Sequence, residues 1–253
     1  MRRHVAVFLV IATALYVGAC GGTQPNTSAP KDAATSGSST PASIATVTGS
    51  PLPSSAGSQQ AKVIVENSGL SVRGKQVGYG LVLRNTSTDQ DATSVKVTCN
   101  LLDGSGTILD TRIETLGLVP AGKRFFYGGD YQGADGAQAK KLEAYIDVGE
   151  SIPAQYWLPK ATHVRLVDQE YFGVTVVGQV SNTTTDGTMS MLTETGCVLF
   201  NGQDQVIGGG YGCLDSDLKP GRSMAFKIIN GTTATALKKI DHFAVSVDNN
   251  FVN

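Results

Sequence analysis

A short set of residues occurs twice in this chain, in the same order and at nearly the same spacing. Each copy contains an Asn-Thr-Ser or Asn-Thr-Thr segment, an Asp-Gly or Asn-Gly pair, a Pro-Gly type of turn, and a Lys-Lys-Leu or Lys-Lys-Ile segment. These begin at Asn85, Asp103, Pro120 and Lys140 in the first copy, and at Asn182, Asn201, Pro220 and Lys238 in the second. A fixed order at one spacing indicates a duplicated unit. We therefore expect two tandem domains, residues 61–150 and 162–253, joined by residues 151–161.

Within each copy, apolar residues alternate with small or polar ones. In the first copy the apolar positions are Val77, Tyr79, Leu81 and Leu83, followed by Val95, Val97, Cys99 and Leu101. A period of two indicates half-buried strands, and residues 61–253 show no helical period. Short strands separated by turns favour an all-β chain in which each domain is a β-sandwich.

The first residues have the layout of an export signal. Arg2 and Arg3 precede an uncharged, mostly apolar run over residues 5–17, which is too short to span a membrane. The run ends in Gly-Ala-Cys20, which resembles a bacterial lipobox. The resemblance implies removal of residues 1–19 and attachment of a lipid to Cys20, which would anchor the chain to a membrane. The alternative is an ordinary signal peptide followed by a chance cysteine.

Residues 20–60 follow this signal and differ in composition from the rest of the chain. They consist mostly of Gly, Ser, Thr, Ala and Pro, and Lys31 and Asp32 are their only charged residues. Such a segment cannot bury enough apolar surface to offset its chain entropy, so we expect a disordered linker. The simplest interpretation is a spacer, and the alternative is a wall-crossing or glycosylated stalk.

Each half of the chain resembles an FxLYD-type domain, a small immunoglobulin-like sandwich of bacterial envelope proteins. The resemblance covers residues 62–149 and 163–249, and rests on the order of the repeated pieces and on a signature before the hairpin. The signature reads Cys-Asn-Leu-Leu-Asp over residues 99–103 and Cys-Val-Leu-Phe-Asn over residues 197–201. Both copies have Cys in place of the leading Phe, and the second ends in Asn. The resemblance implies tandem immunoglobulin-like β-sandwich domains that bind or space, without a known catalytic centre.

The signature residues have structural roles in this interpretation. Cys99 and Leu101 would point into the core of the sandwich. Asp103 and Asn201 would accept hydrogen bonds from the backbone amides two residues later.

The spacing of the cysteines allows one disulfide but does not decide whether it forms. An extracytoplasmic compartment permits disulfides, and Cys197 and Cys213 enclose a hairpin. If the turn centres on residues 202–203, the two cysteines lie on opposite faces, unless a bulge in the Gly208–Gly210 run resets the register. The bridge therefore stays one of two possibilities. Cys99 is expected to be a buried thiol.

Aromatic residues are the candidate binding residues. Phe125, Phe126 and Tyr127 are consecutive, so a strand must present them on both faces. Tyr156 and Trp157 fall in the segment that joins the domains. They either seal the contact between the domains or form a platform for a glycan or a partner peptide.

Charge and composition exclude several classes of function. The chain has 20 Lys and Arg, 21 Asp and Glu and only 3 His, with a formal net charge of −1. This balance of charge gives no sign of the basic surface that nucleic-acid binding requires, so we do not expect the chain to bind nucleic acid. Residues 130–135 and 215–217 carry paired Asp residues but match no EF-hand spacing, so we interpret them as exposed loops. We expect no metal, no cofactor and no catalytic residues.

These features predict a non-catalytic lipoprotein of the cell envelope, located outside the cytoplasm. It would act as a lipid-anchored binding or scaffolding module through contacts with an envelope protein. The alternative is a lipoprotein that binds a glycan or wall polymer. A hydrolase is the least favoured interpretation, because the sequence shows no nucleophile paired with a base.

Overall fold

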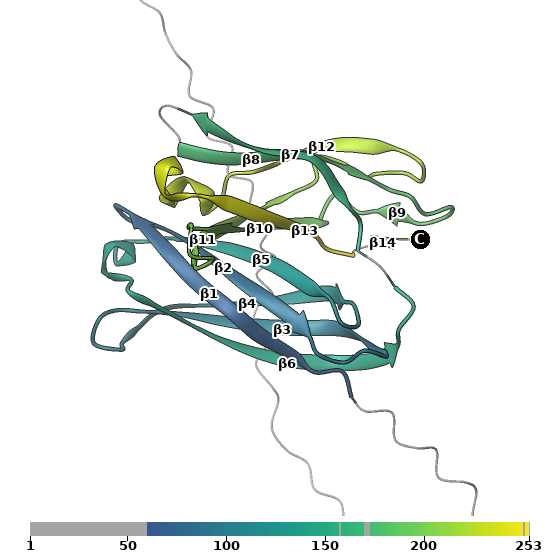
Figure 1. Ribbon diagram of the computed structural model, residues 1–253, viewed down its shortest axis with the longest axis horizontal. Helices are drawn as coiled ribbons and strands as arrows, with labels where there is room; N and C mark the ends of the chain where they lie inside the picture. Colours follow the sequence, from purple (N-terminus) through teal and green to yellow (C-terminus); the bar gives the residue numbers. More distant parts are fainter. Residues whose placement is uncertain (1–59, 157, 170–172, 250, 253) are drawn as a thin grey trace, which may run out of the picture. The chain divides into compact units, whose positions relative to one another are not determined.

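The computed structural model describes residues 60–253 except 157, 170–172, 250 and 253. Trp157 lies outside the described residues. So do the predicted signal over residues 1–19, the predicted lipidation site Cys20 and the predicted linker up to residue 59. The described part is all-β, with three short 3-10 turns and no α-helix (Figure 1). None of its helices is both long and apolar enough to cross a lipid bilayer.

The first half of the chain forms a sandwich of two three-stranded antiparallel sheets. One sheet has the order β1-β2-β5 and the other has the order β4-β3-β6. Its strands are β1 (Val63–Arg73), β2 (Gln76–Asn85), β3 (Gln90–Leu102), β4 (Ile108–Val119), β5 (Arg124–Gln132) and β6 (Lys141–Pro153). The core contains the alternating residues that the sequence predicted, namely Val77, Tyr79, Leu81, Leu83, Val95, Val97, Cys99 and Leu101.

The second half repeats this topology. Its sheets have the orders β7-β8-β12 and β11-β10-β13, which correspond strand by strand to those of the first half. The strands are β7 (Ala161–Gln169), β8 (Gly173–Ser181), β10 (Glu194–Phe200), β11 (Val206–Cys213), β12 (Ser223–Ile228) and β13 (His242–Val247). A small ribbon of β9 (Thr188–Met189) and β14 (Phe251–Val252) is added. The chain is thus two tandem immunoglobulin-like β-sandwiches, which lie within one compact unit.

The repeated asparagines hold the same turn in each sandwich. The Asn85 side chain donates to the carbonyls of Gln90 and Val119, and its Oδ1 accepts from the amide two residues later. Asn182 donates to the carbonyls of Gly187 and Leu218 and accepts from Thr184. Both side chains are buried. The asparagine recurs in both copies because its one side-chain amide satisfies three backbone groups of the turn.

The predicted hairpin turns also have matching hydrogen bonds. Asp103 Oδ1 accepts from the amides of Ser105 and Thr107 at 2.8 and 2.9 Å. Asn201 Oδ1 accepts from the amides two and four residues later, each at 3.0 Å. These contacts confirm the expected structural role of both residues.

The two halves differ in the register of their closing strands. Cys99 of β3 pairs with Ala144 of β6, whereas Cys197 of β10 pairs with Val245 of β13. The closing strands are therefore related by 101 positions (144 to 245). The 98-residue match of the two Lys-Lys segments is wrong as a structural alignment, because the connection to β13 is longer by three residues.

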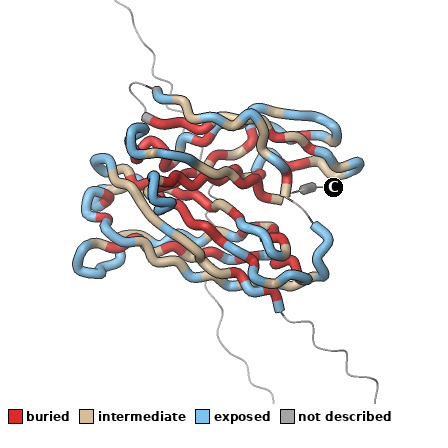
Figure 2. Tube along the Cα trace, viewed as in Figure 1, coloured by how far each residue is buried: buried red, intermediate tan, exposed pale blue. Residues whose placement is uncertain are grey.

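The sheet β1-β2-β5 of the first sandwich packs against the sheet β11-β10-β13 of the second. Figure 2 shows that buried residues are concentrated in these inner strands. A cluster made of Val82, Val198, Phe200 and Val206, with Phe126 packed against it, fills one part of this contact. Both faces of β2 and of β10 are consequently buried, one in its own core and the other against the neighbouring sandwich.

Glycines form the remainder of the contact between the inner sheets. A Cβ atom on Gly80 would lie 2.6 Å from the carbonyl oxygen of Gly208, and one on Gly196 would lie 2.5 Å from that of Phe126. A Cβ on Gly128 would overlap the carbonyl oxygen of Gly210. The two backbones approach this closely only because side chains are missing at these positions.

Candidate functional site

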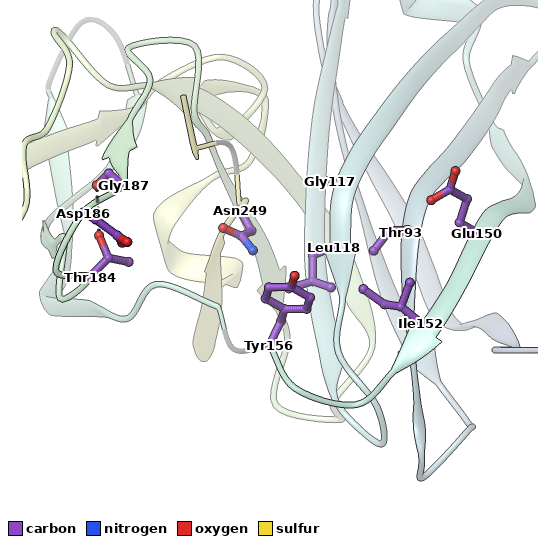
Figure 3. Close-up of a pocket in the computed structure, with 10 residues that line it drawn as sticks. All are labelled: Thr93, Gly117, Leu118, Glu150, Ile152, Tyr156, Thr184, Asp186, Gly187 and Asn249. Carbon is purple, nitrogen blue, oxygen red and sulfur yellow. Dashed lines mark hydrogen bonds between the residues drawn. The ribbon is translucent and has the colours of Figure 1, made fainter. Parts of the chain in front are cut away.

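A pocket of about 560 Å³ lies where the two sandwiches meet, and we call it the joint pocket (Figure 3). Its volume falls in the range of small-molecule sites, about 300–1,000 Å³. The first sandwich contributes Thr93, Leu118, Glu150 and Ile152, the connecting segment contributes Tyr156, and the second sandwich contributes Thr184, Asp186 and Asn249. The site therefore exists only when the two sandwiches are in contact.

Tyr156 has a fixed backbone and a half-exposed ring. Asp91, which is 1% exposed, accepts hydrogen bonds through Oδ2 from the amides of Gln155 and Tyr156, both at 2.9 Å. Its Oδ1 accepts from the amide of Ala121 at 2.8 Å. Tyr156 as a whole residue is 49% exposed. A buried carboxylate thus presents an aromatic surface at the edge of the pocket.

The turn that carries Asp186 is held equally firmly. Asn182 donates to the carbonyl of Gly187, and Thr184 Oγ1 lies within hydrogen-bond distance of the same oxygen and of Asn182 Oδ1. The turn after β8 is therefore fixed from inside the second sandwich. Its free carboxylate, on Asp186, lines the pocket.

The wall between the sandwiches is formed by Asp248, Asn249 and Gly117. Both carboxylate oxygens of Asp248 accept from the Gly117 amide, at 3.1 and 3.0 Å, and Oδ1 also accepts from the Asn249 amide at 2.7 Å. Burial raises the pKa of Asp248, and the hydrogen bonds from these amides oppose the rise. A Cβ on Gly117 would lie 2.6 Å from the Asn249 carbonyl oxygen, so only glycine lets β4 meet the segment that follows β13 this closely.

Asn249 Oδ1 is a buried acceptor without a hydrogen-bond partner among the described residues. Buried acceptors of this kind are rare, because each costs about 1–3 kcal/mol when it is not satisfied. The residue lines the joint pocket. This oxygen has almost no accessible surface, so a ligand in the pocket reaches it only when the Asn249 side chain turns toward the pocket.

The structure separates the aromatic residues that the sequence nominated. Phe125 and Tyr127 are buried in the first core, so they offer no surface for binding. Phe126 is partly buried and packs against the cluster between the sandwiches. Tyr156 alone of the described four reaches the pocket.

The possible disulfide between Cys197 and Cys213 is not formed. Cys197 is a free thiol in the second core and pairs with Gly210, whereas Cys213 pairs with Glu194, three positions away along the sheet. A bulge between Leu199 and Phe200 sets this register, and it does not bring the two cysteines opposite each other. Burial raises the pKa of Cys197 and raises that of Cys99, the other free thiol, to about 12. Both are therefore inert core residues.

A second polar cluster lies where β4 and β5 of the first sandwich meet β10 and β11 of the second. Glu114, Asp130 and Glu194 surround a small cavity of about 40 Å³ together with Arg112 and Tyr211. Burial, followed by repulsion from Glu114 and Asp248, raises the pKa of Glu194 to about 7. In the described part of the chain, no group of His, Cys, Asp and Glu residues is arranged to hold a metal ion. The cavity has room for a water molecule, and its chemistry is that of a pH-sensitive contact.

Sequence reasoning missed the joint pocket and the glycine contact. The pocket draws on segments near residues 93, 117, 150, 186 and 249, which only the packing of the sandwiches brings together. The contact did leave a signal, because glycine occupies alternate positions in the β2 sequence Val-Gly-Tyr-Gly-Leu. In such a strand, glycine takes the positions that polar residues would fill on a solvent-exposed face. A face of glycines lets another backbone pack closely against it.

Comparisons with known proteins add little. No protein-family model matches the sequence, and no curated protein does. Among solved structures, an oxalate decarboxylase is similar over 77% of this chain and 81% of its own, with 10% identity and a TM-score of 0.13. A variant of the Bacillus subtilis oxalate decarboxylase has the same coverage, 9% identity and a TM-score of 0.12.

Proposed function

We propose that this chain is a non-catalytic, lipid-anchored binding module of the cell envelope, and that it holds its ligand in the joint pocket. The observation that carries the proposal is the pocket itself, which has the volume of a ligand site and walls fixed by Asp91, Asn182 and Asp248. Binding sites are commonly placed where domains meet. The proposal includes membership of the FxLYD-type domains, which rests on the repeated signature.

The lipid anchor rests on the Gly-Ala-Cys20 segment after the short apolar run. Two acyl chains hold a protein stably on a membrane, whereas a single chain gives marginal binding. Metabolic labelling with an alkyne fatty acid tests whether Cys20 carries a lipid. The wild-type chain should take up label and sediment with membranes, and Cys20→Ala should do neither. A labelled Cys20→Ala chain would show that the lipid is attached elsewhere.

The binding role is tested by a photo-crosslinking amino acid at position 156 in the full-length chain, expressed in its own cell envelope. The matched control has the same amino acid at position 145, because Tyr145 is 58% exposed on strand β6 and does not line the pocket. A discrete adduct from position 156 and none from position 145 is expected. An envelope protein in the adduct would identify a scaffold partner, and a glycan would identify the alternative class. Equal adducts from both positions, or none, would contradict binding at the joint pocket.

A further inference from the structure

We infer that the joint pocket takes an uncharged, hydroxyl-rich ligand of the glycan class, an inference that rests on the proposed binding function. Three independent features of the lining carry it. They are the sign of its charge, the predominance of hydrogen-bond acceptors among its polar groups, and an exposed aromatic residue beside apolar side chains.

The charge of the lining disfavours anionic ligands. Glu150 and Asp186 are its ionisable carboxylates, and no Lys, Arg or His is among the described residues that line it. A phosphorylated or uronic-acid ligand would meet negative charge with no compensating cation. Figure 3 shows the two carboxylates at opposite ends of the pocket, so they are not placed to share one small cation.

The hydrogen-bonding character of the lining favours a ligand with many donors. The carboxylates of Glu150 and Asp186 are pure acceptors when ionised. Asn249 Oδ1 is buried and unsatisfied, and a turn of its side chain toward the pocket would add a further acceptor. The Thr93 hydroxyl adds a group that both donates and accepts. The Thr184 hydroxyl already donates within its own turn, so it can only accept from a ligand. Sugar hydroxyls both donate and accept, and they satisfy such a set without bringing a charge into it.

Tyr156 supplies the apolar half of a sugar site. In Figure 3 its ring lies between Asn249 on one side and Leu118 and Ile152 on the other. An aromatic ring with a polar tip offers a flat apolar surface of the kind that covers the C–H face of a pyranose. The Asp91 hydrogen bonds fix the backbone under this ring before any ligand arrives, which lowers the cost of ordering it on binding.

An extended protein segment fits the lining less well. Peptides that add to a sheet use free backbone amides and carbonyls at its edge. The amide of Gly117 at the pocket wall is already bound by both oxygens of Asp248. The polar groups that remain available are side chains, as in sites that recognise hydroxyl groups.

The test uses the full-length chain in detergent micelles and isothermal titration calorimetry. The probes are neutral tetrasaccharides of the cellulose, starch, mannan and chitin types, with tetragalacturonate and spermidine as the anionic and cationic probes. At least one neutral tetrasaccharide is expected to bind more tightly than both charged probes. Tyr156→Ala and Asn249→Ala should each weaken its binding by about tenfold, the equivalent of one good contact. Tyr145→Ala, the matched control, should leave the affinity unchanged.

Two further measurements separate a binding role from a structural one. Asn249→Ala removes an unsatisfied acceptor, so it should lose affinity without lowering the midpoint of urea unfolding. Asp186→Asn should improve tetragalacturonate binding several-fold at low salt, whereas Asp147→Asn on the exposed side of β6 should not. Tighter binding of a charged probe, no binding of any neutral tetrasaccharide, or neutral binding that both Tyr156→Ala and Asn249→Ala leave intact would overturn the inference.

The outcomes also distinguish this inference from the binding function on which it rests. A protein-only adduct from a crosslinker at position 156, without saccharide binding, would refute the glycan class and keep the joint pocket as a binding site. Neither adduct nor saccharide binding would refute both.

Discussion

Asn85 and Asn182 show how single side chains decide the shape of the turns in this molecule. Each is buried, and each donates to two carbonyls from different segments while accepting from an amide two residues later. The sequence predicted a turn at both places, because Asn commonly binds its own backbone. It could not predict the carbonyl of Leu218, which lies 36 residues away from its donor.

Replacing either asparagine should destabilise the fold. Asn182→Ala leaves the carbonyls of Gly187 and Leu218 without a donor, and a loss of about 2–4 kcal/mol is expected in the free energy of urea unfolding. Asn182→Asp keeps the acceptor but removes both donors, so it should lose a similar amount. The control is Asn100→Ala, which removes one exposed bond from Thr111 and should cost less than about 0.5 kcal/mol. An Asp variant as stable as the wild type would contradict the role given to the amide.

Glu194 should make stability depend on pH. Its pKa of about 7 lies above the ordinary 4.5, so between these values the folded state keeps a proton that the unfolded state releases. The free energy of unfolding should therefore fall as pH rises from about 4.5 to 7, by up to about 3 kcal/mol, and then level off.

The Glu194→Gln variant tests this in urea titrations at pH 5, 6, 7 and 8. It should lose most of the slope and exceed the wild type in stability at pH 8. Asp248 and Glu114, whose pKa values burial also raises, would account for the remaining slope. Asp147→Asn, at an exposed position, should keep the wild-type slope. An unchanged slope in Glu194→Gln would place the proton on another group.

At the scale of the strands, sequence pattern and structure agree for one face and differ for the other. The alternation in β2 and β3 predicted correctly which residues point into the first core. The same pattern in β2 placed glycine on the opposite face, which was expected to meet solvent and instead meets β11. Pattern alone shows that a face has no side chains, and it does not show what covers that face.

Filling the glycine contact should separate the inner sheets. Gly128→Ala and Gly196→Ala each place a methyl group against backbone of the other sandwich, and a loss of about 3 kcal/mol or more is expected. Gly104→Ala is the matched control, because the nearest heavy atom would be 3.9 Å away, on a flexible lysine side chain. Chemical unfolding followed by circular dichroism measures the three variants. Equal stability of Gly128→Ala and Gly104→Ala would show that the contact is looser than described.

At the scale of the whole molecule, the two sandwiches depend on each other. The sequence predicted two domains, their order and their all-β fold, because those follow from a local pattern and its repetition. It could not predict that unlike sheets of the two sandwiches meet, since that depends on surfaces far apart in the chain. The sequence left the Cys197–Cys213 disulfide open for a related reason, because the register of β10 and β11 depends on a bulge after Leu199.

Unfolding should occur in one transition for residues 61–253. The inner sheets bury Val82, Phe126 and Val198 against each other, so either sandwich alone would expose apolar surface. Near-ultraviolet and far-ultraviolet circular dichroism should give coincident midpoints, and the isolated fragment 61–150 should be much less stable or should self-associate. Two separate transitions, the first leaving a native-like 61–150 sandwich, would contradict this coupling.

The contact between unlike sheets has a consequence for assembly in solution. A head-to-tail contact can repeat from copy to copy, and it grows a filament when its rotation does not close into a ring. The outer sheets of this chain carry side chains where the contact needs glycine. Val177 of β8 stands at the position of Gly80 in β2, and Thr98 of β3 stands at that of Gly196 in β10. Each end of the pair is therefore blocked sterically, and the stack terminates at two sandwiches.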